Sequence, residues 1–488
     1  MRGPFGRMTV AYDFDLVVIG FGSAGMTAAE LGADLGLGVC VVERARAGGD
    51  CLWTGCVPSK ALIASARVAH LMRTADRVGL AAHDPDVDLG AVWARARAVQ
   101  QAIAVGDDDP ARFTAKGIDI RWGTARLAGP HAVEMTSGDG DQSLLTARVV
   151  LVCTGGRPAI PEIAGLSEAG FMTNETLFDL VDVPRRLAFI GGGPIAVELA
   201  QACRRLGIAT TILQRAPTLL TREEPELVAQ LTAMLRHEGV EVATGVRIER
   251  VERVGTAALI VGTVDGVERR WETDAIVVAT GRVVDTEALG LAAAGVVADD
   301  HGVHVDARGR TAIPSIYAAG DVTGRELFTH AAAQQAVVAV RDAFYPGRAS
   351  TGAVVPWATF TDPQLAHAGS TIAEAAARFG TRRVEVHRWS LAHNDRAHTD
   401  ASDGAIVLIE HVRPGRRRLV GAHVLAEGAD ELIGELVLAI ERGMSVADLA
   451  GTVHVYPTIA TSLQQLGGRA AVARAGRYRW LMRRGGRS

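Results

Sequence analysis

The stretch FDLVVIGFGSAG at residues 14–25 places a glycine-rich turn between an apolar run and an alanine-rich segment. The run Phe14–Gly20 is rich in Val and Ile, which is typical of a β-strand buried on both faces. The segment Ala24–Leu35 predicts a helix, and Gly38–Glu43 predicts a second strand. A strand, a glycine turn, a helix and a strand in this order predict a dinucleotide-binding unit.

The glycines of this turn, Gly20, Gly22 and Gly25, allow a tight bend and let backbone amides approach a pyrophosphate. The following helix N-terminus favours the negative charge of that group. Glu43 ends the second strand at the spacing expected of an acid that binds a ribose hydroxyl. We therefore predict that these four residues bind a cofactor.

The same order returns in the middle of the chain, which indicates a duplicated unit. A strand at Leu187–Ile190 is followed by GGGPIA at residues 191–196, and then by a predicted helix and a further strand. Gly191 and Gly193 are the predicted phosphate-binding glycines of this second unit. Each unit also has a later buried strand that ends in Thr-Gly, at Thr154–Gly155 and at Thr280–Gly281.

The second unit lacks the acid that ends the matching strand of the first unit. Gln214 stands at that position, Arg215 follows it, and Arg222 is close by in the sequence. A carboxylate there would hold a ribose 2′-hydroxyl and repel a 2′-phosphate, so its absence beside arginines favours NADPH. The alternative, in which these arginines are surface residues and NADH is the nucleotide, stays open.

A pair of cysteines lies in GGDCLWTGCVPSK at residues 48–60. On a regular helix, Cys51 and Cys56 would have Cα atoms roughly 8–9 Å apart, which exceeds the reach of a disulfide. Gly55 and Pro58 supply the irregularity that closes this gap. A thiol pair just beyond a dinucleotide fingerprint indicates a redox-active disulfide rather than a structural one.

The overall composition points to a cytoplasmic enzyme of several domains. The 488 residues are 48% hydrophobic and include 55 glycines, and the net charge is only −4, so nothing favours nucleic acid or a membrane surface as a partner. Neither a signal peptide nor a membrane-spanning run is evident. Five cysteines do not form a secreted disulfide framework, and Cys40, Cys153 and Cys203 are expected to serve packing.

At this point the chain resembles the class I pyridine nucleotide-disulfide oxidoreductases, which include dihydrolipoyl dehydrogenase, glutathione reductase and mercuric reductase. The resemblance rests on several long motifs that occur in the family's order over nearly the whole chain. Two of these motifs are the glycine-rich turn at residues 14–25 and GGDCLWTGCVPSK at residues 48–60. The others are VCTGGRP (152–158), IGGGPIAVELA (190–200), VVATGR (277–282), TAIPSIYAAGDV (311–322) and VPWATFTDPQLAHAG (355–369).

The resemblance implies an α/β fold with two Rossmann-like dinucleotide-binding domains and a C-terminal α+β dimerisation domain. The expected FAD domain is discontinuous and covers residues 1–155 and 281–347. The expected NAD(P) domain covers residues 156–280, and the dimerisation domain covers residues 348–470 and implies a homodimer. A basic tail is expected over residues 471–488.

The resemblance also assigns roles to single residues. Cys51 matches the interchange thiol that meets the substrate, and Cys56 matches the charge-transfer thiol against the flavin. Lys60 and Glu198 match a Lys–Glu pair beside the isoalloxazine ring, where the lysine would stabilise anionic charge and the glutamate would hold it in place. Asp321, after Gly320, matches the acid that binds the ribityl chain of FAD. We expect Gly281, like Thr154 and Gly155, to lie at the cofactors.

One segment departs from the family's pattern. Disulfide-reducing members carry a His before Pro-Thr and a Glu a few residues on, but here Tyr456 and Thr461 stand at these positions. A neutral Tyr is a poor base at pH 7, so ordinary dithiol–disulfide exchange is in doubt. His454 lies two residues earlier and, on an extended segment, would point the same way as Tyr456, which makes it an alternative base.

The acceptor of the electrons is left open by the sequence. The second fingerprint looks most like that of mercuric reductases, but the chain has no cysteine after Cys203 to hand over a metal ion. A thiol or disulfide, a metal ion and a quinone all remain as acceptors of a mercuric-reductase-like enzyme. The alternatives are a dihydrolipoyl dehydrogenase, a quinone reductase that uses the flavin alone, and a redox-sensing flavoprotein.

A cluster of histidines and acids occurs in HRWSLAHNDRAHTD at residues 387–400. Its spacing matches no metal-binding motif, so we expect a polar hairpin there. No resident metal site is predicted anywhere in the chain.

Overall fold

The computed structural model describes residues 11–284, 286–345 and 354–476. It consists of two compact units. The first unit contains Met1–Pro58, Ala96–Ala159 and Gly281–Gly352, and the second contains Ser59–Arg95, Ile160–Thr280 and Ala353–Ser488. The boundary predicted near residue 347 and residues 477–488 of the predicted basic tail lie outside the described residues, whereas residues 471–476 belong to a helix.

A parallel sheet forms the centre of the first unit. Strand β1 pairs with β2 on one side and β5 on the other, β3 pairs with β2, and β17 pairs with β5. The outer parts of β3 and β5 pair with β4 in an antiparallel extension, which the sequence did not indicate. The bounds are β1 (Phe14–Ile19), β2 (Val39–Glu43), β3 (Asp119–Gly129), β4 (Ala132–Ser137), β5 (Gln142–Val152) and β17 (Ile316–Ala318).

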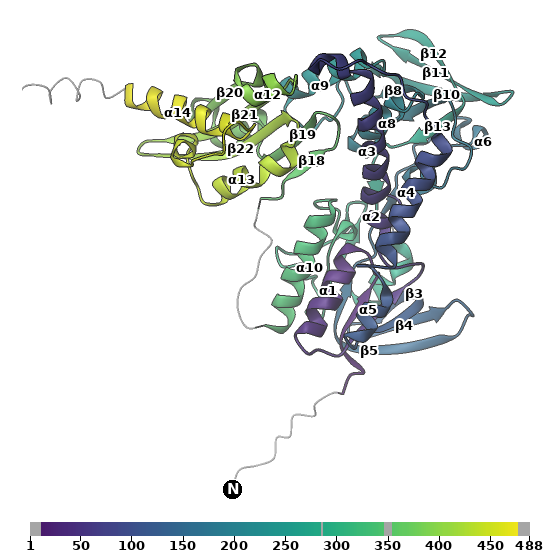
Figure 1. Cartoon of the computed structure of the whole chain (residues 1–488). Coiled ribbons are helices and arrows are strands. Elements are labelled where there is room, and N and C mark those ends of the chain that lie inside the picture. The colour runs from purple at the N-terminus through teal and green to yellow at the C-terminus, as the bar shows by residue number, and fades with distance from the viewer. Residues whose placement is uncertain (1–10, 285, 346–353, 477–488) are drawn as a thin grey trace, which may run out of the picture. The chain divides into compact units, whose positions relative to one another are not determined.

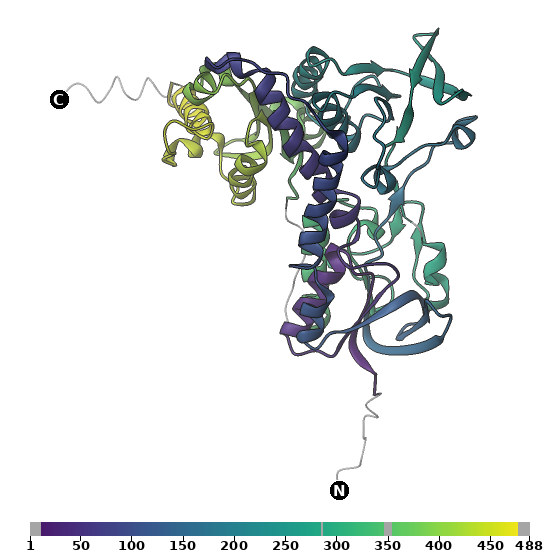
Figure 2. The same cartoon turned by 45° about the vertical axis from the view of Figure 1, so that its right-hand side comes forward.

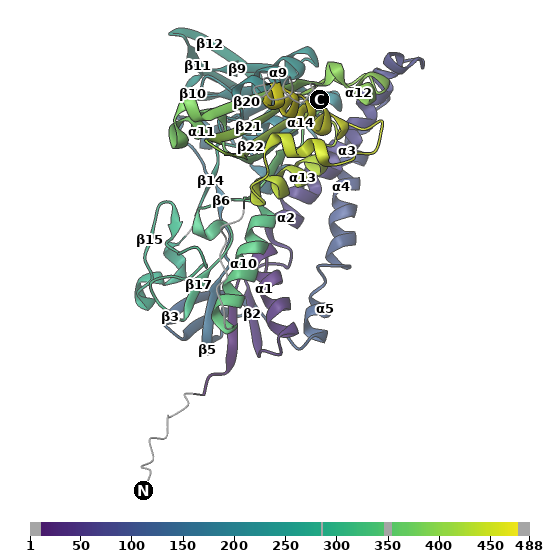
Figure 3. The same ribbon diagram turned by 90° about the vertical axis from the view of Figure 1, so that its left-hand side faces the viewer.

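Two helices lie side by side on one face of this sheet, α1 (Ser23–Asp34) and α10 (Thr329–Phe344), as Figures 1 and 3 show. Their alanines pack against Leu16, Val18 and Val41 of the strands in one buried cluster. Small side chains let the helices approach the strands closely. Because β1 ends at Ile19 and α1 begins at Ser23, the N-terminus of the helix lies just beyond the carboxyl end of the strand.

The nucleotide-binding part of the second unit repeats this plan. Strands β13, β7, β8 and β9 form a parallel sheet in that order. Strands β10, β11 and β12 form a separate antiparallel sheet, drawn in teal in Figure 2. The bounds are β7 (Arg186–Ile190), α8 (Pro194–Arg205), β8 (Ala209–Gln214), α9 (Pro225–His237), β9 (Glu241–Thr244), β10 (Arg247–Val254), β11 (Ala257–Val264), β12 (Val267–Thr273) and β13 (Ala275–Val278).

A helical stretch between residues 56 and 104 is interrupted once. Helix α3 spans Cys56–Arg73 and α4 spans Leu89–Ala104. A short 3₁₀ helix, η1 (Ala75–Val78), and an irregular segment separate them, because Gly79 has φ +83° and Pro85 follows.

The C-terminal part of the second unit is an antiparallel sheet with helices. Its strand order is β18-β19-β22-β21-β20, and helices α13 and α14 pack against one face through Ile433, Leu436, Leu463 and Leu466. The bounds are β18 (Trp357–Thr359), β19 (Gln364–Gly369), α11 (Ile372–Phe379), β20 (Val384–Ser390), α12 (Asp395–Thr399), β21 (Ala405–Arg413), β22 (Arg416–Ala426), α13 (Ala429–Glu441) and α14 (Thr461–Gly476).

Four α-helices occur among the described residues after residue 353. One expectation for this part needs correction. The predicted polar hairpin at residues 387–400 is wrong, because the segment is the end of β20, a 3₁₀ turn and α12. Asn394 caps α12 by accepting a hydrogen bond from the backbone N–H of Ala397, a local signal that the analysis missed.

The remaining elements are short. They are α2 (Gly49–Trp53), α5 (Pro110–Ala115), β6 (Arg157–Pro158), α6 (Leu166–Ala169), α7 (Asn174–Leu177), β14 (Arg282–Val283), η2 (Glu287–Leu289), η3 (Leu291–Ala294), β15 (Ala298–Asp299), β16 (Gly302–Val303), η4 (Asp321–Thr323), η5 (Thr381–Arg383), η6 (Leu391–His393) and η7 (Val446–Gly451). Among the described residues, no helix has both the length and the apolar character needed to cross a membrane.

Candidate active site

The first glycine turn has space for glycine alone at two positions. Gly20 has φ +99°, and a Cβ there would lie 2.4 Å from the carbonyl oxygen of Cys153. A Cβ on Gly25 would lie 2.0 Å from the carbonyl oxygen of Gly20. Gly22 is the N-cap of α1, and no side chain within the described ranges caps that helix. The first N–H groups of α1 are thus available to a phosphate.

Glu43, the predicted ribose-binding acid, is buried and holds the turn. Its Oε2 accepts a 2.7 Å hydrogen bond from the backbone N–H of Phe21, and its Oε1 accepts a 2.8 Å bond from that of Ala45. Each carboxylate oxygen can accept more than one hydrogen bond, so a ribose hydroxyl can still bind. Its role toward the cofactor stays a prediction.

The end of β5 carries an unpaired buried hydroxyl. Thr154 Oγ1 is buried and has no hydrogen-bond partner among the described residues. The next residue, Gly155, has φ +71°, and a Cβ there would meet nothing within 4 Å. Buried polar atoms in folded proteins are nearly always paired, so an orphaned hydroxyl beside open space fits a bound cofactor. These features agree with FAD at this edge of the sheet.

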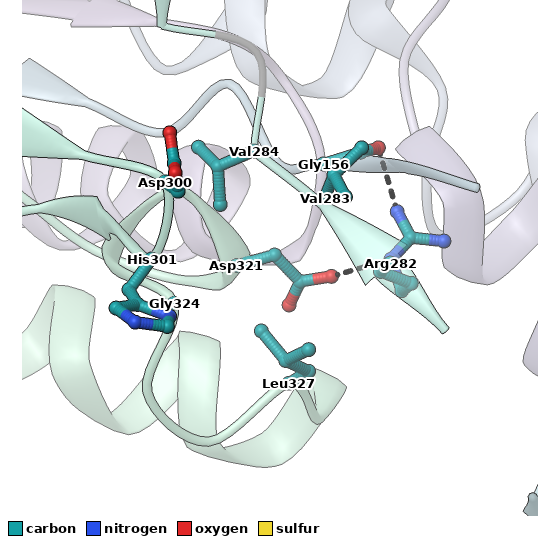
Figure 4. Close-up of a pocket in the computed structure, with 9 residues that line it drawn as sticks. All are labelled: Gly156, Arg282, Val283, Val284, Asp300, His301, Asp321, Gly324 and Leu327. Carbon is teal, nitrogen blue, oxygen red and sulfur yellow. Dashed lines mark hydrogen bonds and ion pairs between the residues drawn. The ribbon is translucent and has the colours of Figure 1, made fainter. Parts of the chain in front are cut away.

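The acid predicted for the ribityl chain, Asp321, forms an ion pair with Arg282 in a small pocket of about 100 Å³ (Figure 4). Arg282 Nε lies 3.0 Å from the Asp321 carboxylate, although the N–H does not point along this line, and the guanidinium also binds Asp50. Burial raises the pKa of Asp321, and Arg282 partly offsets this rise. Gly281 and Gly320, with φ +133° and +81°, precede Arg282 and Asp321. The sequence analysis missed Arg282 and Asp50.

The two cysteines lie on either side of a break between the short helix α2 and the long helix α3. Helix α2 ends at Trp53 and α3 begins at Cys56, and a Cβ on Gly55 would lie 2.9 Å from the carbonyl oxygen of Asp50. The break brings the Cys51 and Cys56 thiols within hydrogen-bond distance of one another. The pKa of the Cys51 thiol is raised, chiefly by a hydrogen bond with Cys56 and secondly by burial.

Cys56 has a second neighbour that the sequence analysis did not identify. Its Sγ lies 3.5 Å from Oγ1 of Thr329, the first residue of α10. Thr329 and Cys56 are 273 residues apart, so no local pattern predicts their contact. A hydroxyl at this distance can donate a hydrogen bond to a thiolate and stabilise its charge.

The other three cysteines are buried and match the expectation of packing roles. Burial raises the pKa of Cys40 and of Cys203 to about 12, and it also raises the pKa of Cys153. Thiols of this kind are poor nucleophiles, because the thiolate is the reactive form.

The predicted Lys–Glu pair exists within the second unit. Lys60 Nζ lies 2.9 Å from Glu198 Oε2, and the Glu198 side chain is 7% exposed. The other carboxylate oxygen accepts a 2.8 Å hydrogen bond from the backbone N–H of Phe360, and the ammonium lies 4.1 Å from the centre of the Phe360 ring. Glu198 thus fixes the ammonium in one place, while the roles of both residues toward a flavin stay predictions.

The second glycine turn is built like the first. Gly191 has φ +114°, and a Cβ there would lie 2.3 Å from the carbonyl oxygen of Ala279. A Cβ on Gly193 would meet nothing within 4 Å, so a ligand can approach this backbone. Helix α8 begins at Pro194 without an acidic residue in its first turn, which leaves its N-terminus suited to a phosphate.

The residues predicted to choose between NADPH and NADH lie after β8. Gln214 ends the strand, and its Nε2 donates a 3.3 Å hydrogen bond to the carbonyl oxygen of Thr218. Arg215 and Arg222 are exposed. The Arg222 guanidinium lies 4.9 Å from the ring centre of Trp357, a cation–π arrangement that orients it. The nucleotide preference stays a prediction.

The segment that departs from the family lies in a loop, not in a strand. Tyr456 is 69% exposed, and its hydroxyl donates a 2.9 Å hydrogen bond to Asp395, which raises its pKa. The His454 side chain is 6% exposed, and its Nε2 lies 3.0 Å from Glu435. The two side chains therefore have different surroundings, contrary to the extended-segment expectation. Thr461 is buried at the start of α14.

Comparisons with known proteins agree with this architecture. Residues 14–343 match the family described as pyridine nucleotide-disulphide oxidoreductase, and residues 355–466 match the dimerisation domain of the same family. The chain is 34% identical to a mercuric reductase of Streptomyces lividans, covering 92% of this chain and 95% of the relative. It is 33% identical to a dihydrolipoyl dehydrogenase of Thermus scotoductus, covering 93% and 96%.

A solved structure with the same fold is the Cu(II) complex of RclA, an HOCl-induced flavoprotein disulfide reductase from Escherichia coli. The two structures superpose with a TM-score of 0.81 at 25% sequence identity, covering 94% of this chain and 99% of RclA. Together the comparisons confirm the resemblance and the fold class predicted from the sequence. They also confirm an oxidoreductase that depends on FAD and NAD(P)H and has a disulfide redox centre.

Proposed function

The chain belongs to the pyridine nucleotide-disulphide oxidoreductase family, and we propose that it is an NADPH-dependent reductase that passes electrons to a metal ion through its Cys51–Cys56 pair, or to a quinone from the flavin. Bound FAD supplies the carrier that accepts two electrons from the nicotinamide and relays them to a disulfide. Cys51 and Cys56 then hold these electrons as two thiols and form a disulfide again when the acceptor takes them.

The observation that carries this choice of acceptor is the hydrogen bond that the Tyr456 hydroxyl donates to Asp395. A disulfide substrate needs a group that moves protons at the interchange thiol, and the hydrogen bond to Asp395 raises the pKa of the Tyr456 phenol further above neutrality. Acceptors that take electrons from a thiolate or from the flavin need no such group. The proposal therefore favours a soft metal ion or a quinone over lipoamide or glutathione disulfide.

The choice of NADPH rests on the residues after β8. No acid stands at position 214, and the exposed guanidiniums of Arg215 and Arg222 lie on the same connection between β8 and α9. A 2′-phosphate carries negative charge and accepts several hydrogen bonds, so it suits arginine better than a 2′-hydroxyl does.

We infer a homodimer from the dimerisation domain and from exposed apolar side chains near Tyr456. Val453 is 89% exposed and Val455 is 78% exposed, although valine side chains in a stable domain are commonly covered. A second copy placed over this segment would cover them and bring Tyr456 to the partner's thiol pair. The cytoplasmic location expected from the sequence stays a prediction.

An acceptor panel tests the proposal directly. FAD-loaded protein is mixed with NADPH and with Hg²⁺, a benzoquinone, glutathione disulfide or lipoamide, and NADPH oxidation is followed. We expect turnover with Hg²⁺ or the quinone to exceed turnover with both disulfides by at least about two orders of magnitude, the usual contribution of acid–base help. Efficient turnover of either disulfide by the unaltered protein would contradict the proposal.

Cysteine variants separate the two proposed acceptors. Cys51→Ala and Cys56→Ala should abolish Hg²⁺ reduction, whereas quinone reduction by the flavin alone should survive. Cys203→Ala is the matched control, because this thiol is buried in α8 and has a raised pKa. If it impaired Hg²⁺ reduction as strongly as Cys51→Ala, the assignment of the thiol pair would be wrong.

A further inference from the structure

Three metal-ligating side chains converge within the second unit. Glu223, His367 and His423 each offer one ligand atom, and these atoms lie within 4.8 Å of one another. All three residues are buried, with exposed fractions of 5%, 1% and 0%. Histidine and carboxylate ligands of this kind are those that zinc and neighbouring divalent metals bind.

The sheet register brings the two histidines together. His367 of β19 lies directly opposite His423 of β22, and Trp357 of β18 lies opposite His367 on the other side. Directly opposite side chains in antiparallel strands project from the same face. Their neighbours Ala366, Ala368, Ala422 and Val424 belong to the cluster beneath α13 and α14, so the histidines project from the other face.

Glu223 comes to this face from the connection between β8 and α9. Its Oε2 lies 3.1 Å from His367 Nδ1, and its Oε1 accepts a 2.5 Å hydrogen bond from Trp357 Nε1. The Trp357 ring stacks on the His367 imidazole at a centroid distance of 3.7 Å. The carboxylate and the first imidazole are thus held in fixed positions.

Each imidazole directs one nitrogen at a backbone carbonyl. His367 Nε2 lies 2.8 Å from the oxygen of Gly369, and His423 Nε2 lies 3.1 Å from the oxygen of Ser370. A carbonyl only accepts hydrogen bonds, so both Nε2 atoms carry a proton and Nδ1 is the nitrogen of each ring that can bind a metal ion. Histidines that bind metals are oriented in this way by a second hydrogen bond to a carbonyl.

The Nδ1 atoms are the nitrogens that remain for a metal ion. His423 Nδ1 is buried and has no hydrogen-bond partner among the described residues, whereas His367 Nδ1 lies 3.1 Å from Glu223 Oε2 and would release any proton it donates there when a metal ion binds. A cation between these atoms would satisfy both nitrogens and the carboxylate at once.

We propose that Glu223, His367 and His423 form a binding site for one divalent metal ion of the zinc type. Two imidazoles and one carboxylate make three ligands, and a water or the second oxygen of Glu223 completes a fourth position. The site is separate from the thiol pair, since it lies in the second unit and contains no sulfur. It fastens the connection that carries Arg222 to the C-terminal sheet.

A zinc-binding measurement tests the site, using full-length FAD-loaded protein with Cys51→Ser and Cys56→Ser so that thiols cannot bind the metal. The protein is stripped with a chelator, dialysed against ZnSO₄ and then against metal-free buffer, and zinc is counted by mass spectrometry. We expect one zinc ion per chain. X-ray absorption at the zinc edge should show only nitrogen and oxygen ligands, at about 2.0–2.2 Å.

The matched variants are His423→Gln and His411→Gln on the same background. His411 is a buried histidine of the same sheet that stacks on Phe379 instead of joining the cluster. Zinc should be lost from His423→Gln, retained by His411→Gln, and should raise the thermal unfolding midpoint only where it is retained. Less than a tenth of an equivalent of zinc in the background protein, or unchanged zinc in His423→Gln, would overturn the proposal. The absorption spectrum decides the question even if His423→Gln does not fold.

Discussion

Glu198 holds Lys60 with one carboxylate oxygen, at 2.9 Å, and uses the other to accept the backbone N–H of Phe360. The carboxylate is buried, while the lysine is about one-third exposed. The position of the ammonium is therefore set by a residue that cannot itself move into solvent. A substitution of Glu198 should therefore also release the ammonium of Lys60.

The variant Glu198→Gln tests the pair. It keeps a carbonyl oxygen for Phe360 but removes the charge that holds Lys60, and we expect a loss of about 1–2 kcal/mol in the free energy of unfolding. Flavin reduction by NADPH should also slow, because the ammonium is no longer fixed. Urea unfolding and stopped-flow absorbance measure the two effects. An unchanged reduction rate with the expected stability loss would leave Glu198 a structural residue only.

The Cys51 thiol should titrate above the ordinary range for cysteine. The hydrogen bond with Cys56 and burial both raise its pKa, and alkylation needs the thiolate. Alkylation of reduced protein by iodoacetamide should therefore be slow at Cys51 at pH 8 and rise as the pH increases. In Cys56→Ala the hydrogen bond that is the chief cause of the raised pKa is removed, so alkylation of Cys51 should become fast at a lower pH than in the parent. Peptide mass spectrometry resolves Cys51 from Cys40 and Cys203, which should stay unlabelled.

The partly buried Asp321 should make the flavin-free protein less stable as the pH rises. Its pKa is raised in the folded state, so the folded protein binds this proton more tightly than the unfolded chain does. The stability that this proton contributes is fully present below about pH 4 and is lost as the pH rises through the raised value. Asp321→Asn should unfold at a higher temperature than the parent at pH 7, and this difference should shrink toward pH 4. A constant difference across this range would show that the carboxyl is not perturbed.

The nucleotide preference is tested at Arg222. If its guanidinium binds the 2′-phosphate, Arg222→Ala should raise the KM for NADPH roughly tenfold to hundredfold, the worth of a charged hydrogen bond. The KM for NADH should change by less than about threefold. Arg269→Ala is the control, because Arg269 is an exposed arginine of β12 in the same unit. Equal effects on both nucleotides would assign Arg222 to the packing of Trp357.

Replacing Tyr456 by His tests the proposed reason for poor disulfide exchange. Tyr456→His should raise lipoamide or glutathione disulfide turnover by about two orders of magnitude and leave flavin reduction by NADPH nearly unchanged. Adding Thr461→Glu should lower the free energy of unfolding, because Thr461 is buried and accepts a hydrogen bond from Asn394. If His454 already acts as the base, Tyr456→His will give no gain and His454→Gln will abolish whatever exchange exists.

The sequence predicted the two nucleotide-binding folds because their signals are local. A glycine turn between a strand and a helix has a short, fixed spacing, and both turns were located from it within a residue or two. The break between α2 and α3 was likewise expected from Gly55 and Pro58. Helix α12 was missed because the helix is only five residues long and was taken for a polar loop.

Contacts between distant segments were not accessible in this way. Thr329 reaches Cys56 across 273 residues, and Arg282 reaches Asp50 across 232. The three residues of the proposed metal site are also far apart, and His367 meets His423 only through the register of β19 with β22. The contact of His367 with His423 depends on a strand register, and a single chain's residue pattern specifies neither that register nor the other long-range contacts.

The connection between β8 and α9 has consequences for protein engineering. Arg222 stacks on Trp357, Glu223 binds Trp357 and His367, and Glu224 accepts the backbone N–H of Ile372. A graft that exchanges this loop to switch between NADPH and NADH would remove two attachments to strands β18 and β19 and a third to the start of α11. A chimera built from two relatives should therefore take the loop and strands β18, β19 and β22 from the same parent.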